Sequence, residues 1–147
     1  MKKYLAYGAN MDVETMAARC PDAKFLGTGI LENYRLMFKG EMPYSYATIE
    51  QWKGYQVPFV LWDISAADEK NLNRYEGYPK HYQKRTVEIE FGGAQIKAMY
   101  YHKPEVLKVN PPMTHYYSAL AKSYETHGFD MKILEAAFEF SDFKFSS

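Results

Sequence analysis

Apolar and polar positions near the start of the chain predict a short strand followed by a short helix. The apolar run at residues 4–7 leads into the turn Gly8-Ala9-Asn10. Beyond this turn, apolar residues recur with the i, i+3, i+4, i+7 spacing of one helix face: Val13, Met16, Ala17 and Cys20. Asn10 or Asp12 is suited to cap the start of this helix, and Pro21 ends it.

Runs of apolar and polar residues predict β-structure over residues 25–64. The polar pair Glu32-Asn33 interrupts the first of these runs, and a loop that carries Pro43 is expected over residues 40–45. We therefore expect two pairs of neighbouring strands: residues 25–31 followed by 34–39, and a hairpin of residues 46–50 with 55–64.

A capping signal and a stop signal delimit a second helix. Ser65 and Asp68 have the S-x-x-D spacing of a capping box, in which the two residues satisfy each other's backbone N–H groups. This spacing predicts a helix over residues 66–75, which Gly77 and Pro79 end.

The strongest hairpin signal lies in the next part of the chain. Residues 84–91 and 94–101 alternate between apolar and polar positions, and Gly92-Gly93 between them suits a tight turn. Two more helices are expected at the end: residues 113–126, stopped by Gly128, and a helix from the cap Asp130 to about residue 138. The elements together predict an α+β fold, in which one domain over residues 1–147 has a small mixed sheet curled into a barrel-like core and a few flanking helices.

Composition and charge exclude several classes of protein. The chain carries 18 Lys plus Arg and 18 Asp plus Glu, so it has no net charge for binding a polyanion. Cys20 is the only cysteine and the four histidines are dispersed, so neither a disulfide nor a zinc motif is expected. The first residues form a strand pattern and no apolar run is long enough to span a membrane. We expect a cytoplasmic protein that binds no metal, membrane or nucleic acid, and no oligomeric state is predicted.

Two segments depart from a purely structural pattern. In the first, Tyr7, Gly8, Ala9 and Asn10 turn a strand end into a helix start, where backbone N–H groups point toward a bound anion. The alternative is an ordinary turn with a helix cap.

Glu76 is the second departure. If Gly77 is the left-handed residue just past the helix, Glu76 lies at the negative end of the helix dipole, where a carboxylate is disfavoured. Tyr75, Tyr78 and Tyr82 surround it in sequence, and desolvation by such rings favours a carboxyl group that exchanges protons. The alternative is an exposed glutamate in a polar loop. No second acid lies within a few residues, so a glycosidase-like pair of carboxylates has no local support.

At these residues the sequence resembles the γ-glutamylcyclotransferase-like superfamily, which includes the AIG2-like proteins. YLAYGANM at residues 4–11 is similar to the family's YGSN-type loop, and NRYEGYPKHY at residues 73–82 is similar to its E-G-x-P segment followed by tyrosine. PMTHY at residues 112–116, with Gly128-Phe129 twelve residues after Tyr116, is similar to its P-S-x-x-Y…G-L pattern. The three segments stand in the family's order.

The resemblance implies a role for each matching residue. Glu76 would be the catalytic acid/base, Tyr7, Gly8, Ala9 and Asn10 the substrate-binding loop, and Tyr82 and Tyr116 part of the pocket wall. It also implies a small β-barrel-like fold and no cofactor. Three residues depart from the family's pattern: Ala9 and Met113 stand where serine is usual, and Ser123 stands where glycine is usual. These departures bear on substrate choice more than on fold.

The reaction implied by the resemblance is an intramolecular aminolysis of a small γ-glutamyl substrate. The α-amine of a γ-glutamyl amide attacks its own γ-carbonyl, which gives 5-oxoproline and releases an amine or amino acid. The identity of that amine stays open. The alternative function is a non-catalytic module that binds small carboxylates or amino-acid conjugates in the same cavity.

Overall fold

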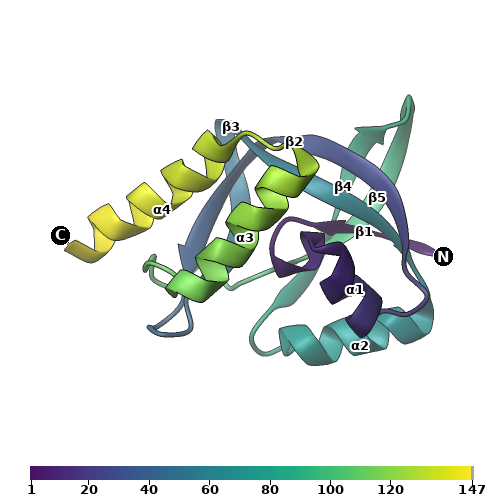
Figure 1. The fold of residues 1–147 in the computed structure, drawn as a ribbon, viewed down its shortest axis with the longest axis horizontal. Helices are drawn as coiled ribbons and strands as arrows, with labels where there is room; N and C mark the ends of the chain where they lie inside the picture. Colours follow the sequence, from purple (N-terminus) through teal and green to yellow (C-terminus); the bar gives the residue numbers. More distant parts are fainter. Residues whose placement is uncertain (147) are drawn as a thin grey trace. The chain divides into compact units, whose positions relative to one another are not determined.

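A computed structural model of the chain describes residues 1–146 (Figure 1). Its elements follow in the order β1 (Lys2–Ala6), the 3-10 turn η1 (Ala9–Met11), α1 (Val13–Arg19), β2 (Lys24–Lys39), β3 (Tyr46–Ile64), α2 (Ala66–Glu76), β4 (Gln83–Phe91), β5 (Ala94–His102), α3 (Thr114–His127) and α4 (Met131–Ser146). In this part of the chain, no helix is long and apolar enough to cross a membrane.

The strands form one mixed sheet in the order β2-β3-β1-β5-β4. The short first strand lies in its middle: β1 pairs antiparallel with β3, from Lys2 opposite Ile64 to Ala6 opposite Val60, and parallel with β5. The order begins with β2 and ends with β4, so the curled sheet does not close into a barrel. The prediction of an α+β fold with a curled mixed sheet is confirmed.

The described chain divides into two compact units, each built from two stretches of sequence. The first unit contains Met1–Gly29 and Phe59–His102, and the second contains Ile30–Pro58 and the chain from Lys103 onward. Each unit has its own fully buried side chains. In the first they include Leu5, Met16, Leu61 and Leu72, and in the second Phe38, Ile49, Leu120, Tyr124 and Leu134. The single domain over residues 1–147 stays a prediction, and residue 147 lies outside the described residues.

Two predicted breaks in the β-structure are wrong. The structure has one continuous strand, β2, where two were expected, and one continuous strand, β3, in place of the hairpin of residues 46–50 and 55–64. Asn33 and Gly54 have φ angles of 64° and 90°, so each bends its strand without ending it. The Asn33 side-chain oxygen accepts a hydrogen bond from the Gly54 N–H at 3.1 Å, which holds these two bends together.

Two helices begin at caps that the sequence predicts, Asp12 for α1 and Asp130 for α4. Asp12 caps α1 by accepting a hydrogen bond from the Thr15 N–H at 2.9 Å, although only Met16 and Cys20 of the expected apolar face are buried. The Asp130 carboxylate accepts from the Lys132 N–H at 3.0 Å at the start of α4, which then continues to Ser146, well beyond the expected end. The β4–β5 hairpin is confirmed, with Gly92-Gly93 between its strands.

Candidate functional site

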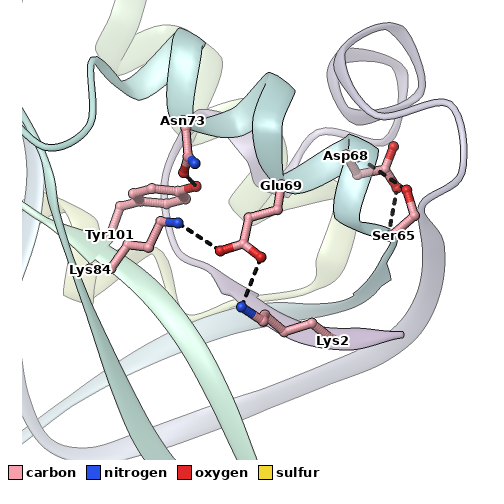
Figure 2. A network of polar contacts seen from close by, with 7 residues as sticks. All are labelled: Lys2, Ser65, Asp68, Glu69, Asn73, Lys84 and Tyr101. Carbon is pink, nitrogen blue, oxygen red and sulfur yellow. Dashed lines mark hydrogen bonds and ion pairs between the residues drawn. The ribbon is translucent and has the colours of Figure 1, made fainter.

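The capping residues of α2 determine where Glu76 lies. The Ser65 hydroxyl accepts from the Asp68 N–H at 3.1 Å, and the Asp68 carboxylate accepts from the Ser65 N–H at 3.2 Å, so the predicted capping box is present. Figure 2 shows this reciprocal pair at the start of the helix. At the other end Gly77 has φ 64°, the expected left-handed conformation, and Glu76 is therefore the last helical residue. Its carboxylate is at the negative end of the helix dipole.

Gly77 is also the place where the chain must turn closely. A Cβ atom built on Gly77 would lie 2.6 Å from Cδ2 of His81, so a larger residue would meet both a backbone penalty and a side chain. The backbone turns back on itself here, because the Tyr78 N–H donates to the Asn73 carbonyl at 2.9 Å and the His81 N–H to the Gly77 carbonyl at 2.8 Å. The half-buried Tyr82 follows this turn and precedes β4.

The predicted loop at the end of β1 folds into a 3-10 turn. Tyr7 is buried and its hydroxyl donates to the Tyr101 carbonyl. The Met11 N–H donates to the Gly8 carbonyl at 3.0 Å, so this N–H already has an acceptor within the turn. The N–H groups to consider for an anion are therefore those of Gly8, Ala9 and Asn10.

Asn10 is the residue that connects this turn to Glu76. Its side chain is almost fully buried, at 2% exposure. Nδ2 donates to Glu76 Oε1 at 3.3 Å and to the Tyr4 hydroxyl at 2.9 Å, while Oδ1 accepts from Arg19 Nη1 at 2.8 Å. The Asn10 backbone carbonyl also accepts from the Trp62 indole N–H at 3.0 Å.

These partners leave one orientation for the Asn10 amide. Arginine can only donate hydrogen bonds, so the amide oxygen must face Arg19. The amide N–H groups then face Tyr4 and the Glu76 carboxylate, which accepts. The Arg19 guanidinium also lies 4.6 Å from the ring centroid of Tyr75, the residue before Glu76, so Arg19 links α1 to the end of α2.

Tyr4 is a neutral neighbour of this carboxylate. Burial raises the pKa of the Tyr4 phenol well above its usual value, and the charge of Glu76 raises it further. The phenol therefore keeps its proton through the neutral range. Among residues 1–146 no group of three or more His, Cys, Asp or Glu residues is placed to hold a metal ion.

Six of the seven predicted site residues belong to the first unit, and two of them, Asn10 and Glu76, are in direct contact. The seventh, Tyr116, belongs to the second unit. There its hydroxyl accepts from the Ala47 N–H at 3.1 Å, and its ring packs edge-on against Tyr46 with centroids 5.0 Å apart. A shared pocket of Tyr116 with Glu76 stays a prediction.

Sequence reasoning did not identify three partners of Asn10: Tyr4, Arg19 and Trp62. Each reaches Asn10 through a different element, namely β1, α1 and β3. Trp62 is 52 residues away in sequence, and no local pattern marks such a contact. Arg19 is recognisable in the sequence only as a basic residue in the last turn of α1. Such a residue is common there because it stabilises the helix dipole, so it does not indicate a contact with Asn10.

The family model described as "Gamma-glutamyl cyclotransferase, AIG2-like" matches residues 4–122. No curated protein sequence matches the chain.

Several solved structures are similar to this chain. One described as "Gamma-glutamyl cyclotransferase" has a TM-score of 0.81 and 23% identity, over 92% of this chain and 85% of its own. A protein from Homo sapiens described as uncharacterized has a TM-score of 0.80 with the same identity and the same coverage. YkqA from Bacillus subtilis has a TM-score of 0.79 and 21% identity over 96% of this chain and 54% of its own. At these identities the similarity establishes the fold.

Proposed function

Because the chain belongs to the gamma-glutamyl cyclotransferase, AIG2-like family, we propose that it cyclises a γ-glutamyl amide to 5-oxoproline and releases an amine or amino acid, with Glu76 as general acid/base. One observation carries this proposal above the others. The Asn10 amide donates to Glu76 Oε1 at 3.3 Å, which joins the two segments that depart from a structural pattern in the sequence. The carboxylate at the end of α2 and the turn after β1 are thus in direct contact.

The proposed reaction needs a single group that moves a proton twice. The substrate's α-ammonium loses a proton to the Glu76 carboxylate, and the free amine attacks the γ-carbonyl carbon. The new C–N bond closes the five-membered ring, and Glu76 gives its proton to the leaving nitrogen as the old amide C–N bond breaks. The ring nitrogen then gives up its second proton through the Glu76 carboxylate to the released amine, so that the ring keeps one N–H and the amine leaves as an ammonium. Nucleophile and electrophile belong to one molecule, so holding the substrate in a folded shape supplies much of the rate gain.

Two opposing influences suit Glu76 to this work. The negative end of α2 favours the protonated carboxyl, whereas the hydrogen bond from Asn10 to Oε1 favours the ionised form. Asn10 also fixes the direction of the carboxylate, because its own amide is oriented by Arg19.

Substrate binding is assigned to the turn and to two tyrosines. The N–H groups of Gly8, Ala9 and Asn10 bind the substrate's α-carboxylate or the oxyanion that develops on the γ-carbonyl. Tyr82 is assigned to the wall of the substrate pocket, and the same role for Tyr116 stays a prediction. No step in this reaction calls for a cofactor or a second acid, and a small zwitterionic substrate agrees with a chain of zero net charge.

The test is a panel of γ-glutamyl amino acids and γ-glutamyl amines, with 5-oxoproline detected by mass spectrometry. We expect Glu76→Gln, which keeps the shape and removes the base, to lower kcat by about 10²–10⁴-fold. The matched control is Glu14→Gln, at an exposed position in the first turn of α1, which should keep full activity.

Two outcomes would contradict the proposal in different ways. Full activity in Glu76→Gln would remove Glu76 from the mechanism. A folded wild-type protein that forms no product from the whole panel would favour the non-catalytic module, and calorimetry should then detect binding of γ-glutamyl compounds without turnover. If Glu76 then takes no part in binding, Glu76→Gln would leave the affinity for these compounds unchanged.

A further inference from the structure

Three polar residues line one face of α2. Glu69, Asn73 and Glu76 are spaced i, i+4, i+7, so they lie on the same side of the helix, one turn after another. Glu76 is held by Asn10, as described above. The other two are held by residues of β1, β4 and β5, and these contacts are drawn in Figure 2.

Glu69 is clamped between two lysines. Lys84 Nζ lies 2.6 Å from Oε2 and Lys2 Nζ lies 2.8 Å from Oε1. Burial pushes the pKa of the Glu69 carboxyl up, but the hydrogen bonds and charges of Lys2 and Lys84 outweigh it and lower the pKa below its usual value. Lys84 is the stronger anchor, because its side chain is 21% exposed and that of Lys2 is 55% exposed.

Asn73 is held one turn closer to Glu76. The Tyr101 hydroxyl donates to Asn73 Oδ1 at 2.7 Å. Burial, and after it the charges of Glu69 and Glu76, raise the pKa of Tyr101, so this phenol remains a donor. The Tyr101 carbonyl accepts from the hydroxyl of Tyr7, and one residue therefore contacts both the helix and the candidate binding turn.

Lys84 also contacts the segment that follows Glu76. Its Nζ lies 4.3 Å from the ring centroid of Tyr78, at a distance typical of a cation–π contact. The Tyr78 ring in turn packs edge-on against Tyr101 with centroids 6.4 Å apart. Lys84 thus holds α2 before Glu76 and the turn after it.

We propose that Lys84 and Tyr101 are positioning residues for Glu76, which set the rotation of α2 about its own axis by holding Glu69, Asn73 and Tyr78. As an assignment of catalytic positioning this rests on the proposed function of Glu76. A rotation of about 10° moves an atom about 6 Å from a helix axis by about 1 Å. A misplacement of about 1 Å can cost an enzyme about 10²-fold in rate. Small changes in these contacts are therefore expected to displace the Glu76 carboxylate enough to lower the rate.

Three variants test the proposal. Tyr101→Phe removes only the hydroxyl that holds Asn73, and Lys84→Met removes the charge that holds Glu69 and Tyr78. We expect each to lower kcat by about 10- to 100-fold with KM within about threefold, because the reacting group moves while the binding turn keeps its own residues. Lys84→Arg should recover most of the activity, since a guanidinium can pair with a carboxylate and stack on a ring.

The chain offers two matched controls. Tyr124→Phe removes a buried hydroxyl that has no hydrogen-bond partner among residues 1–146, and Lys3→Met removes an ion pair with Asp63 that joins β1 to β3. Both should keep kcat within about twofold of wild type, as expected for independent sites.

A spectroscopic measurement separates this inference from the proposed function. The ¹³C resonance of the Glu76 side-chain carboxyl, assigned with Glu76→Gln, should move in Tyr101→Phe and Lys84→Met and stay in place in the two controls. A resonance unchanged in both folded variants would overturn the proposed positioning, whatever the activity. If the wild-type protein forms no product, the proposed function fails while the resonance still decides the geometry. Should Lys84→Met not fold, Tyr101→Phe decides alone.

Discussion

Replacing Asn10 by aspartate tests the centre of the candidate site. The change keeps the shape of the side chain but exchanges the NH₂ group, which donates to Glu76, for an oxygen that can only accept. Two carboxylate oxygens would then face each other at about the present distance of 3.3 Å between Asn10 Nδ2 and Glu76 Oε1. The Tyr4 hydroxyl, 2.9 Å from Asn10 Nδ2, can turn and donate to the new carboxylate, but it does not move the two negative charges apart.

The size of the effect follows from this distance. Two like charges 3.3 Å apart repel by about 5 kcal/mol at an effective dielectric constant of about 20. Arg19, whose Nη1 is 2.8 Å from Oδ1, returns about 1.5–3 kcal/mol because it then donates to a charged acceptor. The remaining repulsion is about 2–3.5 kcal/mol, or about two pK units shared by the pair of carboxyl groups.

The sign of the pH dependence is determined by this repulsion. In the folded Asn10→Asp variant the carboxyl pair holds a proton to higher pH than the same groups do in the unfolded chain, where their pKa values are about 4. The variant should therefore approach wild-type stability near pH 4 and lose about 2–3.5 kcal/mol of unfolding free energy as the pH rises to about 7. Urea unfolding at several pH values measures this difference.

Asn33→Asp is the matched control. Asn33 is exposed and its oxygen accepts from the Gly54 N–H, which a carboxylate can also do. This variant should stay within about 0.5 kcal/mol of wild type at every pH. A flat difference between Asn10→Asp and wild type from pH 4 to 8, or a variant that gains stability as the pH rises, would refute the contact between the Asn10 amide and an ionised Glu76.

Two further predictions concern backbone conformation and thiol chemistry. Gly77→Ala should lose about 2 kcal/mol of unfolding free energy and Gly128→Ala about 1 kcal/mol. Both glycines adopt left-handed φ angles, but of the two only a Cβ on Gly77 would meet a neighbour, His81. Equal losses in thermal or urea unfolding would show that the His81 side chain moves aside at no cost. Cys20, 1% exposed and with its pKa raised to about 12 chiefly by burial and then by Asp68, should resist a thiol reagent at pH 8 and react only in denaturant. Rapid labelling of the native protein would contradict this.

The parts of the fold that could be predicted are those with local causes. The capping box of Ser65 and Asp68, the left-handed stop at Gly77 and the Gly92-Gly93 turn each act through neighbours in sequence, and the structure contains all three. The position of Glu76 at the last turn of α2 followed from the same local signals. The end of α2 could therefore be located without knowing which residues contact it in space.

The parts that could not be predicted depend on distant contacts. Asn33 and Gly54 are typical turn residues, yet they bend long strands because a hydrogen bond between them, 21 residues apart in sequence, replaces the expected turns. The environment of Asn10 has the same origin. Arg19 and Trp62 orient its side chain and backbone from α1 and β3, and only tertiary packing brings them there.

The neighbours of Glu76 have a consequence for where a proton can reside. An amide such as that of Asn10 does not titrate in the neutral range, and the pKa of the Tyr4 phenol is raised well above its usual value. Neither group can take up a proton that the carboxylate has accepted, or supply one in its place. In the proposed reaction Glu76 would therefore carry to the departing nitrogen both protons that the ammonium gives up, and the net reaction would exchange none with the solvent through these two neighbours.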